Sequence, residues 1–165
     1  MTRKIIFFTL LVIYVSNIKA QAKATFPKSF FTENFDSVVV YGLYESHVGI
    51  TSNGKFNNKA VKTRVLLSAT DLDSLNSILS SKKVFNFTNS TSSSTYSYGI
   101  LFYKNGFISS VIDFSIKYKF LVILYKAVEE SNKKWKTLSF QARYCYEVNN
   151  NGVTQFKKFL AQIGV

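Results

Sequence analysis

The feature that most constrains this fold is a pair of β-rich runs joined by an Asn-Gly turn. The runs are Tyr96–Tyr103 and Phe107–Phe114, and Lys104-Asn105-Gly106 lies between them. Asn and Gly tolerate the positive φ angles of a type I′ turn, whose twist matches that of a hairpin. The sequence therefore predicts a β-hairpin here, and with it an antiparallel sheet.

Further strands are predicted on both sides of the hairpin. Each is a run rich in β-branched and aromatic residues, which pack well in a sheet. Gly42 lies inside the first run and indicates a bulge, and the turn residues of segment 51–58 follow, with Asn53-Gly54 as a tight turn. The predicted strands are Ser37–Tyr44, Val61–Leu67, Phe120–Tyr125 and Leu138–Val148.

Two amphipathic helices complete the pattern. Ser68 can cap a helix over Ala69–Ser80, with Asp71 three residues on, and a closing helix follows Asn149 and stops at Gly164. Their apolar faces are formed by Leu72, Leu75, Ile78 and Leu79, and by Val153, Phe156, Phe159, Leu160 and Ile163. Strands and helices do not alternate regularly, so the pattern predicts an α+β fold. We expect a mainly antiparallel sheet, one short helix after the second strand and a C-terminal amphipathic helix.

The first 22 residues have the three zones of a secretory signal peptide. Positive charges at Met1–Lys4 precede the apolar run Ile5–Val15, and Ala20-Gln21-Ala22 has the spacing of small residues that a signal peptidase reads. The apolar run is too short to span a bilayer. We expect cleavage after Ala22 and an exported protein, periplasmic or secreted, without a transmembrane segment. An uncleaved N-terminal anchor is the alternative.

Residues 23–165 fit one α+β domain, and they remain basic. The full chain carries 21 Lys and Arg against 9 Asp and Glu; loss of Arg3, Lys4 and Lys19 with the signal peptide lowers the net charge from +12 to +9. A basic protein favours anionic partners, such as an anionic polymer or an acidic protein. The lysines are scattered, however, as on an ordinary solvated surface, and no specific nucleic-acid motif is present.

Two polar stretches offer possible binding or modification sites. Segment 86–95 is low in complexity and predicts a surface loop with glycosylation sequons at Asn86 and Asn89. Such short matches arise often by chance, so we assign no site to them. Trp135 stands alone in the polar segment 129–136, where it is either an exposed anchor for a partner or, more commonly, a cover for the edge of the core.

The residue types that carry catalysis are scarce. His47 and Cys145 are the only residues of their kinds, and with Asp113 they could be imagined as a thiol triad, although nothing in the sequence brings them together. The spacing of zinc ligands and a glycine-rich phosphate loop are also missing. We therefore expect no catalytic, cofactor-binding or metal residues, and a buried or idle thiol at Cys145. An intermolecular disulfide or a nucleophilic role is the alternative for this thiol. Alternation in its strand places Cys145 with Arg143 and Glu147, opposite Ala142, Tyr144 and Tyr146.

The hairpin YGILFYKNGFISSVIDFS and the terminal segment NGVTQFKKFLAQIGV carry a resemblance. They are similar to a group of small exported bacterial proteins of uncharacterised function, which share an FY-x-NG hairpin and a terminal amphipathic helix. Members of that group often carry cysteines beside the second hairpin strand and a Pro-Arg-His element before the first. This chain has Asp113 and Ile116 at the cysteine positions and Tyr96-Ser97-Tyr98 in place of Pro-Arg-His. The resemblance implies a fold and export, and no metal or redox role.

Three hypotheses of function follow. The first is a non-enzymatic binding module that uses its sheet edge, hairpin or basic surface. The second is a cell-envelope hydrolase whose active-site residues are polar groups that the sequence does not distinguish from ordinary surface. The third is attachment by charge alone to an anionic glycan or a membrane surface. A deep pocket with convergent polar groups would favour the enzyme, and binding that falls steeply with added salt would favour attachment by charge.

Overall fold

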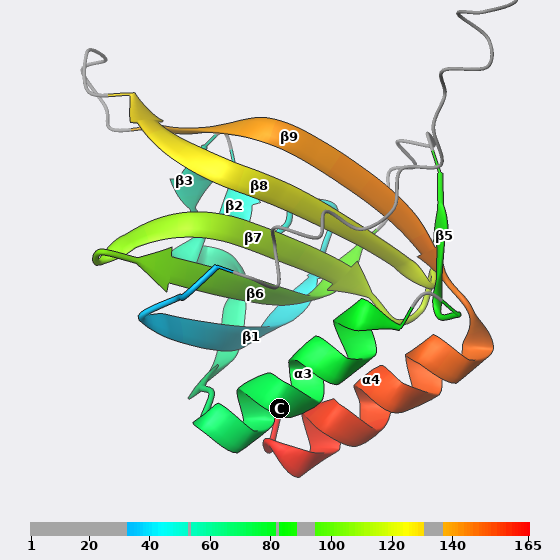
Figure 1. The fold of residues 1–165 in the computed structure, drawn as a ribbon. Coiled ribbons are helices and arrows are strands. Elements are labelled where there is room, and N and C mark those ends of the chain that lie inside the picture. Colours follow the sequence, from blue (N-terminus) through cyan, green and yellow to red (C-terminus); the bar gives the residue numbers. More distant parts are fainter. Residues whose placement is uncertain (1–32, 53, 82, 89–94, 131–136) are drawn as a thin grey trace, which may run out of the picture.

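The main feature of the fold is a seven-stranded antiparallel sheet, in the order β4-β1-β6-β7-β8-β9-β5, with a separate two-stranded ladder β2-β3 (Figure 1). The structure is a computed structural model that describes residues 33–52, 54–81, 83–88, 95–130 and 137–165. The predicted signal peptide, Asn53, Asn89 and Trp135 lie outside these ranges. The strands are β1 Ser37–Ser46, β2 Thr51–Ser52, β3 Lys55–Phe56, β4 Val61–Leu66, β5 Phe85–Phe87, β6 Tyr96–Lys104, β7 Phe107–Ser115, β8 Phe120–Glu130 and β9 Thr137–Val148.

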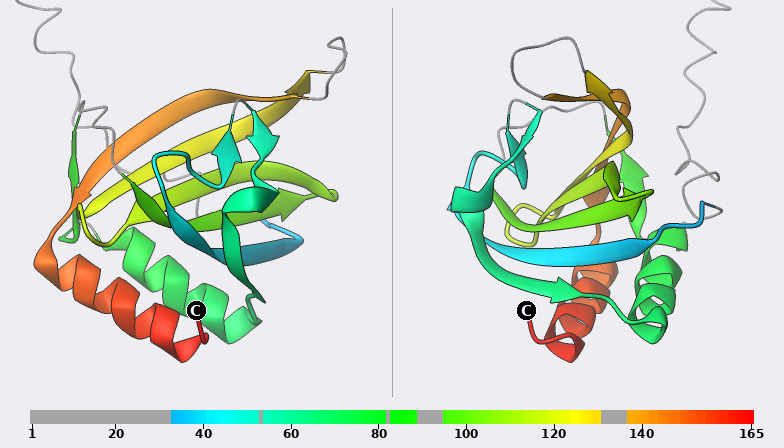
Figure 2. Two further views of the ribbon diagram at one scale, coloured as in Figure 1. Left: turned by 180° about the vertical axis from the view of Figure 1, so that it is seen from behind. Right: turned by 90° about the vertical axis from the view of Figure 1, so that its left-hand side faces the viewer.

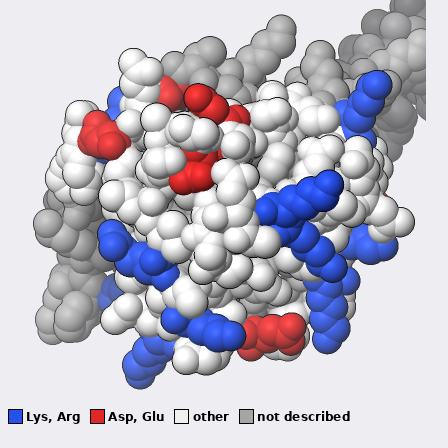
Figure 3. Space-filling model, turned by 90° about the horizontal axis from the view of Figure 1, so that it is seen from below, with Lys and Arg blue, Asp and Glu red and all other residues white. Residues whose placement is uncertain are grey.

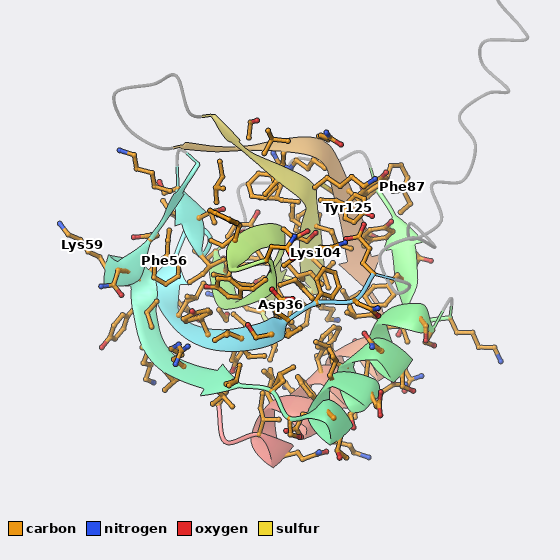
Figure 4. All side chains as sticks on the ribbon, turned by 60° about the vertical axis from the view of Figure 1, so that its left-hand side comes forward. Asp36, Phe56, Lys59, Phe87, Lys104 and Tyr125 are labelled. Carbon is orange, nitrogen blue, oxygen red and sulfur yellow. The ribbon has the colours of Figure 1, made fainter. Side chains whose placement is uncertain are left out.

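The predicted hairpin is β6 and β7. Lys104 pairs with Phe107, so Asn105 and Gly106 form a two-residue turn, with φ angles of 53° and 77°. Both angles are positive, as the Asn-Gly pair predicts. The Asp36 carboxylate accepts a hydrogen bond of 3.2 Å from the Gly106 amide, and Figure 4 shows Asp36 near this turn. The turn is therefore held both by its own residues and by the chain that enters β1.

Two helices, α3 (Ala69–Ser80) and α4 (Asn150–Gln162), cover one face of the sheet (Figure 1). Ser68 Oγ accepts from the Asp71 amide at 3.2 Å and the Asp71 carboxylate accepts in return, which forms a capping box. The hydrogen bond from Ser68 lowers the pKa of Asp71 below its usual value. Asn149 Oδ1 accepts from the Gly152 amide and caps α4, and Gly164 has a φ of 78° just beyond its end. The two helices, together with the antiparallel sheet, confirm the predicted α+β fold.

Apolar side chains form one cluster on each face of the sheet. The first lies under the helices, where the Phe114 and Phe156 rings approach to 4.4 Å between centroids. The second lies on the opposite face and includes Val39, Leu101 and Cys145. Tyr146 belongs to the first cluster and Cys145 to the second, so the predicted alternation in β9 is confirmed, as is the burial of the thiol. Both faces of the central strands are thus buried.

One segment differs from the sequence prediction, and a second contains more regular structure than the predicted turn. Asn86 and Phe87 begin the predicted loop but belong to β5, which pairs with the end of β9. The rings of Phe85 and Phe87 lie 6.0 and 5.9 Å from that of Tyr146, and these aromatic contacts hold the short strand in place. The predicted turn 51–58 contains the β2-β3 ladder and leads into a 3-10 turn, Asn58–Ala60.

The sheet curves, and the β2-β3 segment crosses the face away from the helices (Figure 2). Its Gly54 carbonyl accepts a hydrogen bond of 2.7 Å from the Leu138 amide of β9. This hydrogen bond joins the segment that follows β1 to β9, which lies near the opposite edge of the sheet. Among the helices that the structure describes, none has the length and apolar character that crossing a membrane requires.

Candidate functional site

A groove of about 540 Å³ lies where β1, β4 and β6 meet the last turns of α4. We call it the lysine groove. Segments that are far apart in the sequence line it, because β1 lies between β4 and β6 in the sheet. Its lining consists of Gly42, Leu43, Glu45, Lys62, Thr63, Ser97, Tyr98, Ile116, Lys117, Lys157, Leu160, Ala161 and Val165.

The groove is shaped by the predicted bulge in β1. Gly42 pairs with Thr63 on one side and Tyr98 on the other, and both registers shift immediately after it. A Cβ atom at Gly42 would collide with Thr63 Oγ1 and would lie 3.2 Å from Val165 Cγ1. The absence of a side chain therefore lets β4 and Val165 approach β1 closely, and the register shift opens the space beside them.

The side chains around the groove carry a positive charge. Lys62 on β4, Lys117 after β7 and Lys157 on α4 are exposed, and Glu45 is the one acidic side chain of the lining. Within the described residues, none of the three ammonium groups forms an ion pair. The Lys117 ammonium lies 5.3 Å from the centroid of the Tyr118 ring, a cation–π contact. Three cations are thus available to an anion from solution.

The surface on the helix side of the molecule also carries more basic than acidic side chains (Figure 3). Figure 3 shows Lys and Arg side chains spread over much of this face, whereas Asp and Glu form fewer and separate groups. At the groove itself, half-buried Tyr98 and Ile116 and buried Leu160 add apolar wall. No histidine, cysteine or aspartate belongs to the described lining. The arrangement therefore suits binding of an anionic group with an apolar neighbour.

A second polar cluster lies on the opposite face, around Asp113. Its carboxylate is buried and accepts a hydrogen bond of 2.8 Å from the Ile50 amide. Burial raises the pKa of Asp113 to about 7, against the smaller opposing effects of that hydrogen bond and of Arg143. Tyr96 lies close by, and its pKa is raised by burial and by the Asp113 charge, against the effect of Arg143. A carboxylate in this position titrates near neutral pH.

The three residues of the imagined triad do not form a catalytic arrangement. Asp113 pairs with Val122, and Val122 with Cys145, so one strand separates the two side chains. At roughly 4.8 Å between strands, their Cα atoms are about 10 Å apart. His47 is exposed in the bend after β1, and no hydrogen bond among the described residues links it to either partner. Asp113 instead holds the backbone at Ile50.

The lysine groove is not evident in the sequence. Lys62, Lys117 and Lys157 lie far apart in the sequence and share no motif there. The order of strands in the sheet and the packing of α4 against it bring these lysines together, and Gly42 was the one local signal nearby. Neither cluster contains a metal site: the described residues include no group of three or more His, Cys, Asp or Glu side chains that could hold an ion.

Comparison of the chain with protein-family models, with curated proteins and with solved structures finds no significant match.

Proposed function

We propose that this chain is an exported, non-enzymatic binding module whose lysine groove holds an anionic partner. The observation that carries the proposal is the convergence of Lys62, Lys117 and Lys157, from three separate elements, around one groove. Each is free of an ion pair within the described part of the chain. A cluster of like charges raises the local concentration of anions and speeds their association. Export rests on the signal-peptide pattern of residues 1–22.

The groove also supports a binding role over a catalytic one. Its lining offers the hydroxyls of Thr63, Ser97 and Tyr98, and Glu45 is the one side chain there that could act on them as a carboxylate general base. Among the described residues, no hydrogen bond joins Glu45 to any of these hydroxyls. The apolar wall beside the lysines favours a partner that presents an anionic group next to an apolar surface. An acidic protein segment and an anionic polymer both supply the charge, and the salt dependence of binding separates the two.

The test is a titration of the full chain with linear inorganic polyphosphate. A triple variant, K62Q/K117Q/K157Q, is compared with K59Q/K83Q/K104Q, which removes the same charge from exposed lysines outside the groove. Two of these control lysines are labelled in Figure 4. Each ion pair near a surface contributes on the order of 0.2–1 kcal/mol, so three pairs together contribute about 0.6–3 kcal/mol. The groove variant should therefore bind about tenfold more weakly, and the control less than about threefold.

Equal losses in the two variants would show that net charge alone drives binding and would reject the groove. The titration is repeated at about 0.1 M and about 1 M salt, between which the Debye length falls from roughly 10 to 3 Å. Affinity for polyphosphate should fall steeply over this range. A partner from the cell envelope that is retained at the higher salt concentration would identify a protein ligand with apolar contacts. Turnover of a cell-wall or peptide substrate that is lost with His47→Ala or Cys145→Ala would overturn the non-enzymatic role.

A further inference from the structure

The segment that crosses the second apolar cluster is fixed to the sheet at a few defined points. We call it the arm; its described residues are 49–52 and 54–57. At its base the Asn57 amide donates to the Ile50 carbonyl at 2.8 Å, and at its tip the Leu138 amide donates to the Gly54 carbonyl at 2.7 Å. The Phe56 ring lies 5.4 Å from that of Tyr41. Figure 4 shows Phe56 at this side of the molecule and Lys59, just beyond the arm, directed away from it.

The root of the arm rests on the buried carboxylate of Asp113. Besides the hydrogen bond from the Ile50 amide, the arm contributes Gly49, where a Cβ atom would collide with the carboxylate. The Ile50 side chain is fully buried, and it packs where a Cβ atom at Gly99 would otherwise lie. The arm thus covers Asp113 with backbone and with an apolar side chain, and these exclude water from the carboxylate.

The other groups that face Asp113 compensate its charge only in part. Arg143 on β9 stabilises the ionised carboxylate, and the same residue lowers the pKa of Tyr96 on β6. Cys145, also on β9, raises the pKa of Tyr96. The residue that pairs with Asp113 on β8 is the apolar Val122. Arg143 is exposed, so water screens its charge. An ionised Asp113 is therefore unfavourable while the arm covers it.

We propose that the arm is a strap over the sheet, which opens when Asp113 ionises and closes when Asp113 is protonated. Opening admits water to the carboxylate, which then titrates as an exposed group, near its ordinary pKa of 3.8. The closed form holds the proton more tightly, so it is favoured at low pH and loses stability as the pH rises through about 7. The strap lies on the face opposite α4, and none of its described residues lines the lysine groove.

The test is amide hydrogen exchange of the full chain between about pH 5.5 and 8.5, expressed as protection factors so that the intrinsic pH dependence of exchange cancels. The amides of Ile50, Asn57 and Leu138 report the arm, and that of Ile123 reports the centre of the sheet. The arm amides should be less protected than Ile123 at every pH, because the arm opens without unfolding the sheet. Their protection should fall by about tenfold between pH 5.5 and 7 and then level off.

Asp113→Asn keeps an oxygen that can accept from the Ile50 amide but cannot ionise, so its arm protection should not vary with pH. Tyr96→Phe is the matched control, because it alters a neighbour and leaves the carboxylate, and it should retain the pH dependence. In the wild-type protein, the carboxyl ¹³C shift of Asp113 should titrate with the same midpoint as the arm. Flat wild-type protection, a slope retained in Asp113→Asn, different midpoints, or arm amides as protected as Ile123 would each overturn the strap.

Discussion

At the scale of single residues, Asp113 is the side chain whose environment departs most from what its type prefers. It occupies a strand whose neighbours are apolar, and among the described residues it is the one charged side chain that is buried. An acidic residue in the run Val111–Phe114 was visible in the sequence. Its partner, the Ile50 amide, was not, because the two residues are 63 positions apart and the bond involves backbone.

Asp113 should make the stability of the whole protein depend on pH. Its pKa is about 7 in the folded protein and about 3.8 when unfolded, so the folded state binds the extra proton between these values. The free energy of unfolding should therefore be highest at low pH and fall by about 2–3 kcal/mol from pH 5 to pH 8 as a result of this group. Urea unfolding at the two pH values measures the change. Asp113→Asn should remove most of it, and an equal pH dependence in that variant would place the titrating group elsewhere.

At the scale of elements, the sequence predicted the strands and helices whose own turn and capping residues favour the structure that they adopt in the fold. Asn105-Gly106 sets the turn of β6-β7, and Ser68 and Asp71 set the start of α3. The arm contains β2 and β3, whose two residues each are too few to show an alternation of apolar and polar side chains. Strand β5 is stabilised by contacts between aromatic rings, such as those of Phe85 and Tyr146, and its three residues are too few to establish such an alternation on their own. The lysine groove depends on the order of strands in the sheet, which periodicity in one segment does not determine.

Gly152 tests whether local preference or packing dominates in α4. Alanine has the higher helix propensity, by about 1 kcal/mol. A Cβ atom at position 152 would, however, collide with Val84 Cγ1 and lie 2.7 Å from Val148 Cγ1. Overpacking typically costs 1–3 kcal/mol, so Gly152→Ala should lower the free energy of unfolding, as measured with urea.

Thr154→Ala, at an exposed position of the same helix, is the control and should change stability much less. The double variant Val84→Ala/Gly152→Ala should recover part of the loss relative to the sum of the single variants. A Gly152→Ala protein more stable than the wild type would mean that Val84 moves aside without cost and that propensity dominates at this position.

At the scale of the whole molecule, the proposal depends on where the protein resides and on the charge that it carries there. Protein recovered from the envelope or medium of its host should begin at Lys23, as intact mass and N-terminal sequencing can show. Ala22→Phe places a large residue where the peptidase requires a small one, so its mature form should be reduced or absent. An exported wild-type protein that still begins at Met1 would indicate the uncleaved anchor.

The sheet order also governs when each strand can find its partners during synthesis. The strands β6 to β9 follow one another in sequence and pair with their immediate neighbours, so this meander closes only short loops. By contrast, β1 leaves the ribosome early, and one of its partners, β6, begins 50 residues after β1 ends. Until then, β1 can pair with β4, while its other edge and its apolar residues lack their final cover. The nascent chain therefore carries an aggregation-prone strand for much of its synthesis, and a factor that shields β1 at that stage should raise the yield of folded protein.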